Sequence, residues 1–287
     1  MREVFLPRSL EDFWPVWETN PRAWVYAWGT DLLVKIRSGL LNPPSLICLE
    51  RIEELKGVTE DGEALRIGAL TTHARLLSDP LIEKYLPVLR KALKVLGSPL
   101  IRNRGTIGGN ICTASPAGDT LPPLYALRAE LELCSKNAVR RMPIRDFITG
   151  PGMNGLHEKE LLAAVWVKKD GAHNLHHFEK VGLRNALACS LVSLAALIRL
   201  SPEGIVEKAA LAWGSVGPTI VTSPGAEEKL IGRTLCGESL RAAAAVAREA
   251  VSPITDERAD AGYRRAVSGN LLLRLIQTAA EAGGVEP

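Results

Sequence analysis

The chain has 287 residues, of which 46% are apolar and 23% are charged, and its formal net charge is only +3. These values are typical of a globular protein with one large or two modest domains, and they exclude a disordered chain. Because lysine and arginine form no long run, the sequence does not predict a nucleic-acid partner.

The five cysteines are widely spaced and form no C-x-x-C pair. This spacing predicts neither a disulfide framework nor a zinc or iron–sulfur site within the chain. The longest apolar stretch, around residues 191–198, is far shorter than the ~20 residues that a membrane span needs. We therefore expect a cytoplasmic protein with reduced thiols and no membrane partner.

The first 170 residues mix strand-like and helical patterns. Ser9 precedes a short amphipathic run that contains Pro15, and Pro87 begins a helix that ends at Gly97. Residues 141–147 and 151–152 read as loop and turn. Apolar runs predict strands at 23–26, 45–49, 64–69, 130–134 and 161–167, and further helices from Thr71 or Thr72 to Leu77 and at 121–127.

The remainder of the chain reads as a smaller unit. Strands are expected at 175–181, 190–199 and 209–216, with a hairpin turn at 202–204, and helices at 238–251 and 260–280. The pattern therefore predicts an α+β fold in two domains, 1–170 and 171–287. The first divides near residue 56, and the second has a three-stranded antiparallel sheet with helices.

The most informative stretch runs from Arg102 to Ile111 and has three glycines in five residues, at 105, 108 and 109. Such a backbone can expose consecutive N–H groups and admit a bulky anion, which favours a phosphate site. A tight turn that holds no ligand is the alternative. A second candidate for the same role is the turn at 27–32, where Gly29 is followed by Thr30 and Asp31.

Other polar residues are open to two interpretations. Asp119 follows the glycine-rich stretch closely and either contacts a ligand or caps the helix from Leu121. Lys180 and Arg184 either reach a ligand or are solvated charges. The cluster of His173, His176 and His177 lacks a carboxylate or thiol at ligand spacing, so no metal site is predicted. We name no catalytic residue.

These motifs together resemble those of the FAD-binding medium subunit of molybdenum hydroxylases, the carbon monoxide dehydrogenase and xanthine dehydrogenase family. The resemblance covers nearly the whole chain. It rests on the motif at 102–110 with the A-S-P-A-G-D run at 114–119, the turn at 27–32, the segment from Phe178 to Arg184, and the Tyr-Arg-Arg run at 263–265.

The resemblance implies a FAD-binding domain of the PCMH type and assigns the cofactor contacts. Both glycine segments would bind the FAD pyrophosphate through backbone N–H groups. Ser115 and Asp119 would lie along the ribityl and ribose part, and Lys180 near the isoalloxazine. The implied cofactor-binding residues are Ala27, Trp28, Gly29, Thr30, Asp31, Leu32, Thr106, Ile107, Gly108, Gly109, Asn110, Ser115, Asp119 and Lys180.

Two positions depart from the family pattern. Trp28 stands where the family has the first glycine of the A-G-G-T-D-L turn, and Ala188 stands where the family usually has an aspartate. If position 28 required a positive φ, the indole would strain the backbone by roughly 1–3 kcal/mol. On this reading Trp28→Gly preserves or strengthens FAD binding.

By resemblance, the chain is the electron-transfer flavoprotein subunit of an oxidoreductase complex. A molybdopterin-binding large subunit would hydroxylate the organic substrate, a small subunit would carry [2Fe–2S] clusters, and the terminal acceptor would be a carrier such as NAD⁺. Two alternatives stay open at this point. The chain is a structural subunit in which Trp28 has weakened or abolished FAD binding, or it is a stand-alone flavin oxidoreductase.

Overall fold

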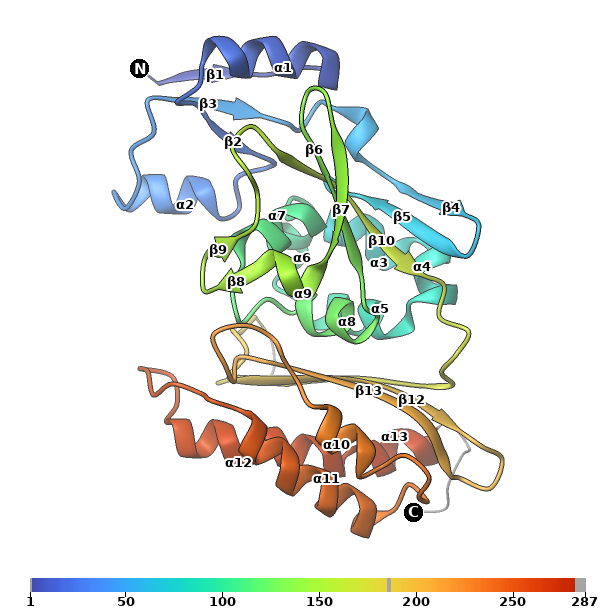
Figure 1. Cartoon of the computed structure of the whole chain (residues 1–287). Helices are drawn as coiled ribbons and strands as arrows, with labels where there is room; N and C mark the ends of the chain where they lie inside the picture. The colour runs from blue at the N-terminus through green and yellow to red at the C-terminus, as the bar shows by residue number, and fades with distance from the viewer. Residues whose placement is uncertain (1, 185–186, 282–287) are drawn as a thin grey trace.

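The computed structural model describes residues 2–184 and 187–281. Apart from a two-stranded sheet within residues 148–154, three sheets follow one another from the N-terminal to the C-terminal end of the molecule, with helices above, between and below them (Figure 1). The first sheet is parallel and the other two are antiparallel. The α+β class expected from the sequence is confirmed.

The N-terminal part is a small parallel sheet in the order β1-β3-β2. Parallel strands need crossover connections, and two helices supply them. Ser9 caps the first helix, as expected, by accepting a hydrogen bond from the Asp12 N–H at 3.0 Å. Its elements are β1 (Glu3–Phe5), α1 (Leu10–Thr19), β2 (Trp24–Tyr26), α2 (Leu32–Arg37), β3 (Ser45–Cys48) and the 3-10 helix η1 (Glu53–Leu55).

The central part is built on a five-stranded sheet in the order β4-β5-β10-β6-β7. Six of its seven helices lie in the sequence between β5 and β6, and the seventh, α9, follows β7. The elements are β4 (Val58–Asp61), β5 (Ala64–Gly68), α3 (His73–Ser78), α4 (Pro80–Tyr85), α5 (Pro87–Val95), α6 (Pro99–Arg102), α7 (Ile107–Thr113), α8 (Leu121–Ala126), β6 (Glu130–Cys134), β7 (Val139–Pro143), α9 (Ile144–Phe147), β8 (Ile148–Gly150), β9 (Met153–Asn154) and β10 (Leu161–Lys168).

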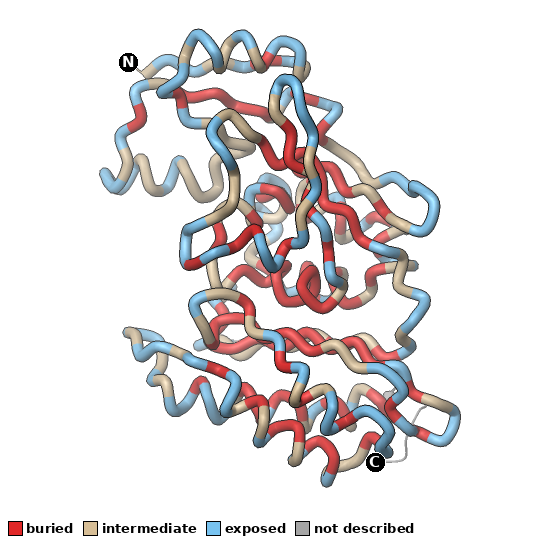
Figure 2. Tube along the Cα trace, in the orientation of Figure 1, coloured by how far each residue is buried: buried red, intermediate tan, exposed pale blue. Residues whose placement is uncertain are grey.

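The strand β10 comes last in this part of the sequence but lies in the middle of the sheet, between β5 and β6. Its residues are buried from Leu161 to Val167 (Figure 2). Leu161 and Ala163 pack toward the N-terminal part, while Leu162 and Val165 join the main core. A strand buried on both faces needs a continuous apolar run, which is the pattern seen here.

Residues 141–147 were expected to be loop, and this expectation is wrong. Residues 139–143 form the edge strand β7, and 144–147 form the helix α9. The sequence of β7, VRRMP, has no apolar alternation that would indicate a strand. It becomes one because a tight turn at 135–138 brings it alongside β6, whose backbone groups pair with it.

The C-terminal part is an antiparallel sheet in the order β11-β12-β13-β14 with four helices below it (Figure 1). The three long strands and the turn at 202–204 are confirmed, and a two-residue fourth strand adds to them. The helix expected over 260–280 is divided at Arg274. The elements are β11 (Leu175–Val181), β12 (Val192–Leu200), β13 (Val206–Gly214), β14 (Val221–Thr222), α10 (Pro224–Glu228), α11 (Gly237–Ala250), α12 (Ala261–Leu273) and α13 (Leu275–Glu281).

Both faces of the C-terminal sheet are covered. On β12, Val192, Leu194 and Ala196 pack toward the lower helices, whereas Ala195 and Leu197 join the core of the central part. The helices α5 and α8 fill the space between the two sheets. Apolar side chains of the C-terminal sheet therefore pack against the central part. This packing places β11 and the start of β12 beside the turn that precedes α8.

Candidate functional site

The first glycine segment, residues 27–32, connects β2 to α2. Gly29 has φ +79° and is the residue of this turn in the left-handed region, whereas Trp28 is not among the described residues with positive φ. The strain expected for Trp28 is therefore absent, because the conformation that needs glycine falls one residue later. α2 begins after Asp31 without a side-chain cap, and the Leu33 N–H in its first turn donates to the Gly29 carbonyl at 3.1 Å.

The second glycine segment, residues 105–110, is not a loop as expected, because α7 begins at Ile107. Thr106 is the N-cap, and its Oγ1 accepts a hydrogen bond from the Gly109 N–H at 3.0 Å. The N–H groups of Ile107 and Gly108 donate to the Thr71 and Ala69 carbonyls. The Asn110 N–H donates to the Thr106 carbonyl at 3.0 Å, so four of the amides implied as phosphate ligands are already hydrogen-bonded within the protein.

Gly108 lies directly against β5. A Cβ at this position would be 2.6 Å from the Ala69 Cβ and 2.8 Å from the Ala69 carbonyl oxygen. Gly108 is buried, while the adjacent Gly109 is exposed. The two neighbouring glycines therefore differ in role: Gly108 allows α7 to pack on the sheet, and Gly109 leaves the outer flank of α7 without a side chain.

The fold brings the two glycine segments together through side chains. Thr113 Oγ1, at the end of α7, lies 3.3 Å from Asp31 Oδ2 and 2.9 Å from the Gly109 carbonyl oxygen, which are two acceptors for one hydroxyl proton. Lys35 Nζ lies 2.7 Å from the same aspartate oxygen. On the other side, the Arg104 guanidinium carbon lies 4.4 Å from the centre of the Trp28 ring. Residues about 80 positions apart in the sequence thus flank one small region.

The predicted residues that follow α7 point back into the protein. Ser115 Oγ accepts a hydrogen bond from the Ala117 N–H at 3.3 Å, and the Asn110 side-chain oxygen accepts one from the Thr120 hydroxyl. Thr120 itself is fully buried. These contacts stabilise the turn that connects α7 to α8.

Asp119 and Lys180, predicted as separate ligand contacts, form a buried ion pair. Lys180 Nζ lies 2.6 Å from Asp119 Oδ2, and the side chains are 10% and 9% exposed. Ser190 donates to the other carboxylate oxygen at 2.7 Å. Burial raises the pKa of the Asp119 carboxyl, and the charge and hydrogen bond of Lys180 oppose this shift. Asp119 does not cap α8, whose N-cap is Thr120.

Known families match this chain over both of its parts. Residues 1–167 match the FAD binding domain in molybdopterin dehydrogenase. The chain belongs to this family. In addition, residues 177–279 match the CO dehydrogenase flavoprotein C-terminal domain. FAD is the cofactor of this molybdopterin dehydrogenase flavoprotein, and the resemblance stated from the sequence is confirmed.

Relatives of this flavoprotein are similar over almost their whole length. It is 32% identical to the xanthine dehydrogenase FAD-binding subunit of Escherichia coli O157:H7, with 92% of this chain and 91% of the relative covered. It is 30% identical to the nicotinate dehydrogenase FAD-subunit of Eubacterium barkeri, with 92% and 90% covered. The chain is thus similar to subunits of oxidoreductases with different substrates.

Solved structures agree on the fold. The chain superimposes on carbon monoxide dehydrogenase from Hydrogenophaga pseudoflava with a TM-score of 0.91, 30% identity and 98% of each chain covered. For quinoline 2-oxidoreductase from Pseudomonas putida 86, the TM-score is 0.93 at 26% identity and 99% coverage of each chain. Within residues 2–184 and 187–281, none of the helices has the length and apolar character required to cross a bilayer.

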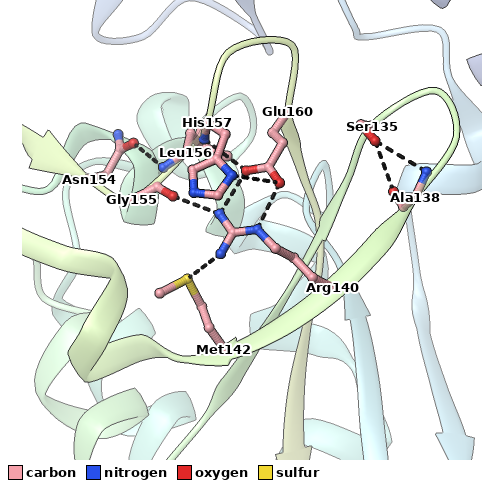
Figure 3. A network of polar contacts seen from close by, with 9 residues as sticks. All are labelled: Ser135, Ala138, Arg140, Met142, Asn154, Gly155, Leu156, His157 and Glu160. Carbon is pink, nitrogen blue, oxygen red and sulfur yellow. Dashed lines mark hydrogen bonds and ion pairs between the residues drawn. The ribbon is translucent and has the colours of Figure 1, made fainter.

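The flavoprotein holds the C-terminal end of α7 through the 150–155 turn. The Gly152 N–H donates to the Ala114 carbonyl, and Asn154 Nδ2 donates to the Cys112 carbonyl at 2.9 Å. Behind this turn, Arg140 bridges Glu160, at 2.7 Å, and the Gly155 carbonyl oxygen, at 2.8 Å (Figure 3). The sequence did not indicate this network, because its members carry no motif.

Arg140 is also the main reason that the pKa of the Glu160 carboxyl falls to about 2, with a further contribution from the His157 N–H. The Glu160 side chain is only 10% exposed. The carboxylate therefore remains ionised at neutral pH and keeps the turn against α7.

His73 was also missed by the sequence reasoning. It lies beneath the second glycine segment, where its backbone N–H donates to the Gly105 carbonyl at 2.9 Å. The ring is 3% exposed, and its Nδ1 has no hydrogen-bond partner among the described residues. Burial lowers the pKa of His73 to about 4, so the ring is neutral at physiological pH.

Two of the three histidines at 173–177 have a hydrogen-bond partner, whereas His176 Nδ1 is buried without one among the described residues. His173 Nδ1 lies 2.8 Å from Asp170 Oδ1, and His177 Nδ1 lies 2.8 Å from the Thr278 hydroxyl. Arg184 donates to the Leu187 carbonyl at 2.6 Å. These residues hold the connection between the two domains and the edge of the C-terminal sheet.

Proposed function

We propose that this chain is the FAD-carrying electron-transfer subunit of a molybdenum hydroxylase complex. It passes electrons from [2Fe–2S] clusters on a small partner subunit to a terminal acceptor such as NAD⁺, while a molybdopterin-binding large subunit oxidises the substrate. When bound, FAD supplies the redox chemistry that connects one-electron clusters to a two-electron acceptor. We also propose a cytoplasmic location, which is supported by the free cysteines, since none of those described forms a disulfide bond.

The observation that carries the proposal is the contact between the two glycine segments. Thr113 Oγ1 lies 3.3 Å from Asp31 Oδ2, and this approach places the turn at Gly29 beside the exposed flank of α7 at Gly109. A dinucleotide needs such a surface, where backbone approaches it without intervening side chains. The residues present fit FAD, because Gly29 is left-handed and α2 begins without a side-chain cap.

Within this proposal the predicted residues have distinct roles. The backbone of 28–32 binds the pyrophosphate, and the flank of α7 at Gly109 lets the pyrophosphate approach without an intervening side chain. The internal hydrogen bonds of Ile107 and Gly108 keep α7 against β5. Asp119 and Lys180, held together and bound by Ser190, orient the ribityl and ring portions. We take residues 1–170 as the FAD-binding domain, in parts 1–56 and 57–170, and 171–287 as the C-terminal domain, a division that the two family matches support.

The assignment to a multi-subunit complex is supported by relatives that are medium chains or medium subunits, such as the carbon monoxide dehydrogenase medium chain and the nicotine 6-hydroxylase medium subunit. The described residues contain no cluster of three or more His, Cys, Asp or Glu side chains that would hold a metal ion. The proposed iron–sulfur clusters are therefore placed on a partner subunit.

The proposal is tested on the purified chain. We expect flavin absorption bands at close to one FAD per chain after reconstitution, and anaerobic bleaching of these bands by NADH. Affinity purification from the native host should also recover subunits that contain molybdenum and iron–sulfur clusters. A reconstituted chain without flavin absorption would contradict the proposal. Recovery as a single flavin-containing chain, with no partner subunits, would favour a stand-alone oxidoreductase.

A further inference from the structure

Trp28 and Arg104 form a contact that joins the two glycine segments. Trp28 immediately precedes the left-handed Gly29, and Arg104 immediately precedes Gly105. The Arg104 guanidinium carbon lies 4.4 Å from the indole ring centre, which is the geometry of a cation–π interaction. The side chain of Arg104 is thus held above the turn at 27–32.

The other cations beside these segments are already engaged. Arg102 turns away and donates from Nη1 to the Leu96 and Gly97 carbonyls at 2.8 and 3.0 Å. Lys35 is 2.7 Å from Asp31. Within the described part of the chain, the Arg104 guanidinium has the indole as its partner and forms no hydrogen bond or ion pair. Its N–H donors therefore remain available to an anion.

Trp28 adds a second sign of an incomplete contact. The residue is only partly buried, but its indole Nε1 is fully covered and has no hydrogen-bond partner among the described residues. A buried N–H group without an acceptor is unfavourable. An oxygen-rich ligand placed between the segments would supply acceptors for the Arg104 guanidinium, whose position the covered indole fixes.

We propose that Arg104 binds the diphosphate of FAD and that Trp28 is the positioning residue that holds Arg104 in place. This inference rests on the proposed function. Guanidinium groups bind phosphate oxygens through paired charge-assisted hydrogen bonds, and the internally bonded amides of α7 leave charge on the diphosphate to be neutralised. The large side chain at position 28 is then a contact that strengthens FAD binding, which reverses the expectation for Trp28→Gly.

The first test measures the FAD dissociation constant of the stripped and reconstituted full chain. Arg104→Gln should weaken FAD binding about 10- to 100-fold, and Arg104→Lys should recover part of the loss. The matched control is Arg141→Gln, because Arg141 lies 3.7 Å from the Trp166 ring on the edge of the central sheet. It removes an equivalent cation–π pair and should leave FAD affinity unchanged.

Salt dependence separates a phosphate contact from a structural effect. Added salt should weaken FAD binding by the wild type more than by Arg104→Gln, because screening acts on the charge that the variant lacks. Trp28→Leu should weaken binding about 2- to 30-fold, while Trp28→Phe keeps most of the affinity. Trp28→Leu should add little to Arg104→Gln in the double variant, since both act through one contact.

The outcomes are distinguishable. A wild-type chain that binds no FAD overturns the proposed function and this assignment with it. A wild-type chain that binds FAD, with Arg104→Gln equally tight or equally salt-sensitive, overturns the role of Arg104 alone. Tighter binding by Trp28→Gly than by the wild type overturns the positioning role of Trp28.

Discussion

Lys180 Nζ lies 2.6 Å from Asp119 Oδ2, and this ion pair joins the C-terminal sheet to the turn before α8. Both side chains are about nine-tenths buried. Removing one member of such a pair leaves an uncompensated charge away from water, which costs more than the pair itself contributes. The pair therefore adds a buried polar link to the apolar contact between the two domains.

Asp119→Asn should lower the free energy of unfolding by about 3 kcal/mol in urea denaturation of the flavin-free chain. The double variant Asp119→Asn with Lys180→Met should recover part of this loss, because no charge is left unpaired. As a control, Glu18→Gln breaks the exposed pair with Lys136 and should change stability by less than about 1 kcal/mol. Equal effects of Asp119→Asn and Glu18→Gln would contradict the importance of burial.

Substitution of the two glycines that flank α2 distinguishes the cost of backbone strain from the cost of a steric clash. Gly29 and Gly39 both have φ +79°, but a Cβ at Gly29 would lie 2.4 Å from Leu33 Cδ1, whereas at Gly39 nothing lies within 4 Å. Gly39→Ala should cost about 1–2 kcal/mol from conformation alone. Gly29→Ala should cost more and also weaken FAD binding.

The steric part of this difference can be removed. Combining Gly29→Ala with Leu33→Ala should bring the loss of stability down to that of Gly39→Ala, as measured by thermal and urea unfolding. If Gly29→Ala and Gly39→Ala are equally stable, Leu33 does not restrict the turn.

Stability should fall as the pH falls from about 6.5 to about 4 because of His73. Burial lowers its pKa from the ordinary 6.5 to about 4. In this range His73 is protonated in the unfolded chain but stays neutral in the folded protein. Acidification therefore lowers the free energy of unfolding by about 3 kcal/mol, and the full contribution is present above pH 6.5. His73→Leu should reduce this slope, and the remainder comes from His177, because burial also lowers the pKa of His177 to about 4. An unchanged slope in the variant would show that His73 is not buried as a neutral ring.

The Arg140–Glu160 pair should stabilise the turn that holds α7. Glu160→Gln should lower the free energy of unfolding at neutral pH by about 1–3 kcal/mol, because Arg140 loses a charged acceptor. Since the pKa of Glu160 is lowered from 4.5 to about 2, the wild type loses this contribution as the pH falls through that range. The difference between wild type and variant should therefore shrink below pH 4.5, and a constant difference would argue against an ionic contribution.

Local features were predictable from the sequence because neighbours in the chain determine them. Ser9 caps α1, Thr72 caps α3, and Pro87 begins α5, since caps and proline act within one helical turn. The continuous apolar runs of β10 and β12 also identified these strands. The glycine motifs identified the family, because their spacing is unusual.

Other features arise only from contacts between distant segments. The second glycine segment starts a helix because the Ala69 and Thr71 carbonyls accept its first N–H groups, and β7 is a strand because β6 pairs with it. Secondary-structure propensity depends on neighbouring residues, so it does not predict hydrogen bonds whose partners lie far away in the sequence.

The motif by itself determined which cofactor the chain carries, and the turn chemistry of Gly29 needed no distant partner. Whether Trp28 strains that turn was decided by the tertiary structure, which places the positive φ on Gly29 and the Arg104 guanidinium on the indole. Likewise, Asp119 and Lys180 became one buried pair only when the two domains packed. Charges that are solvated in an extended chain interact strongly once burial removes the water between them.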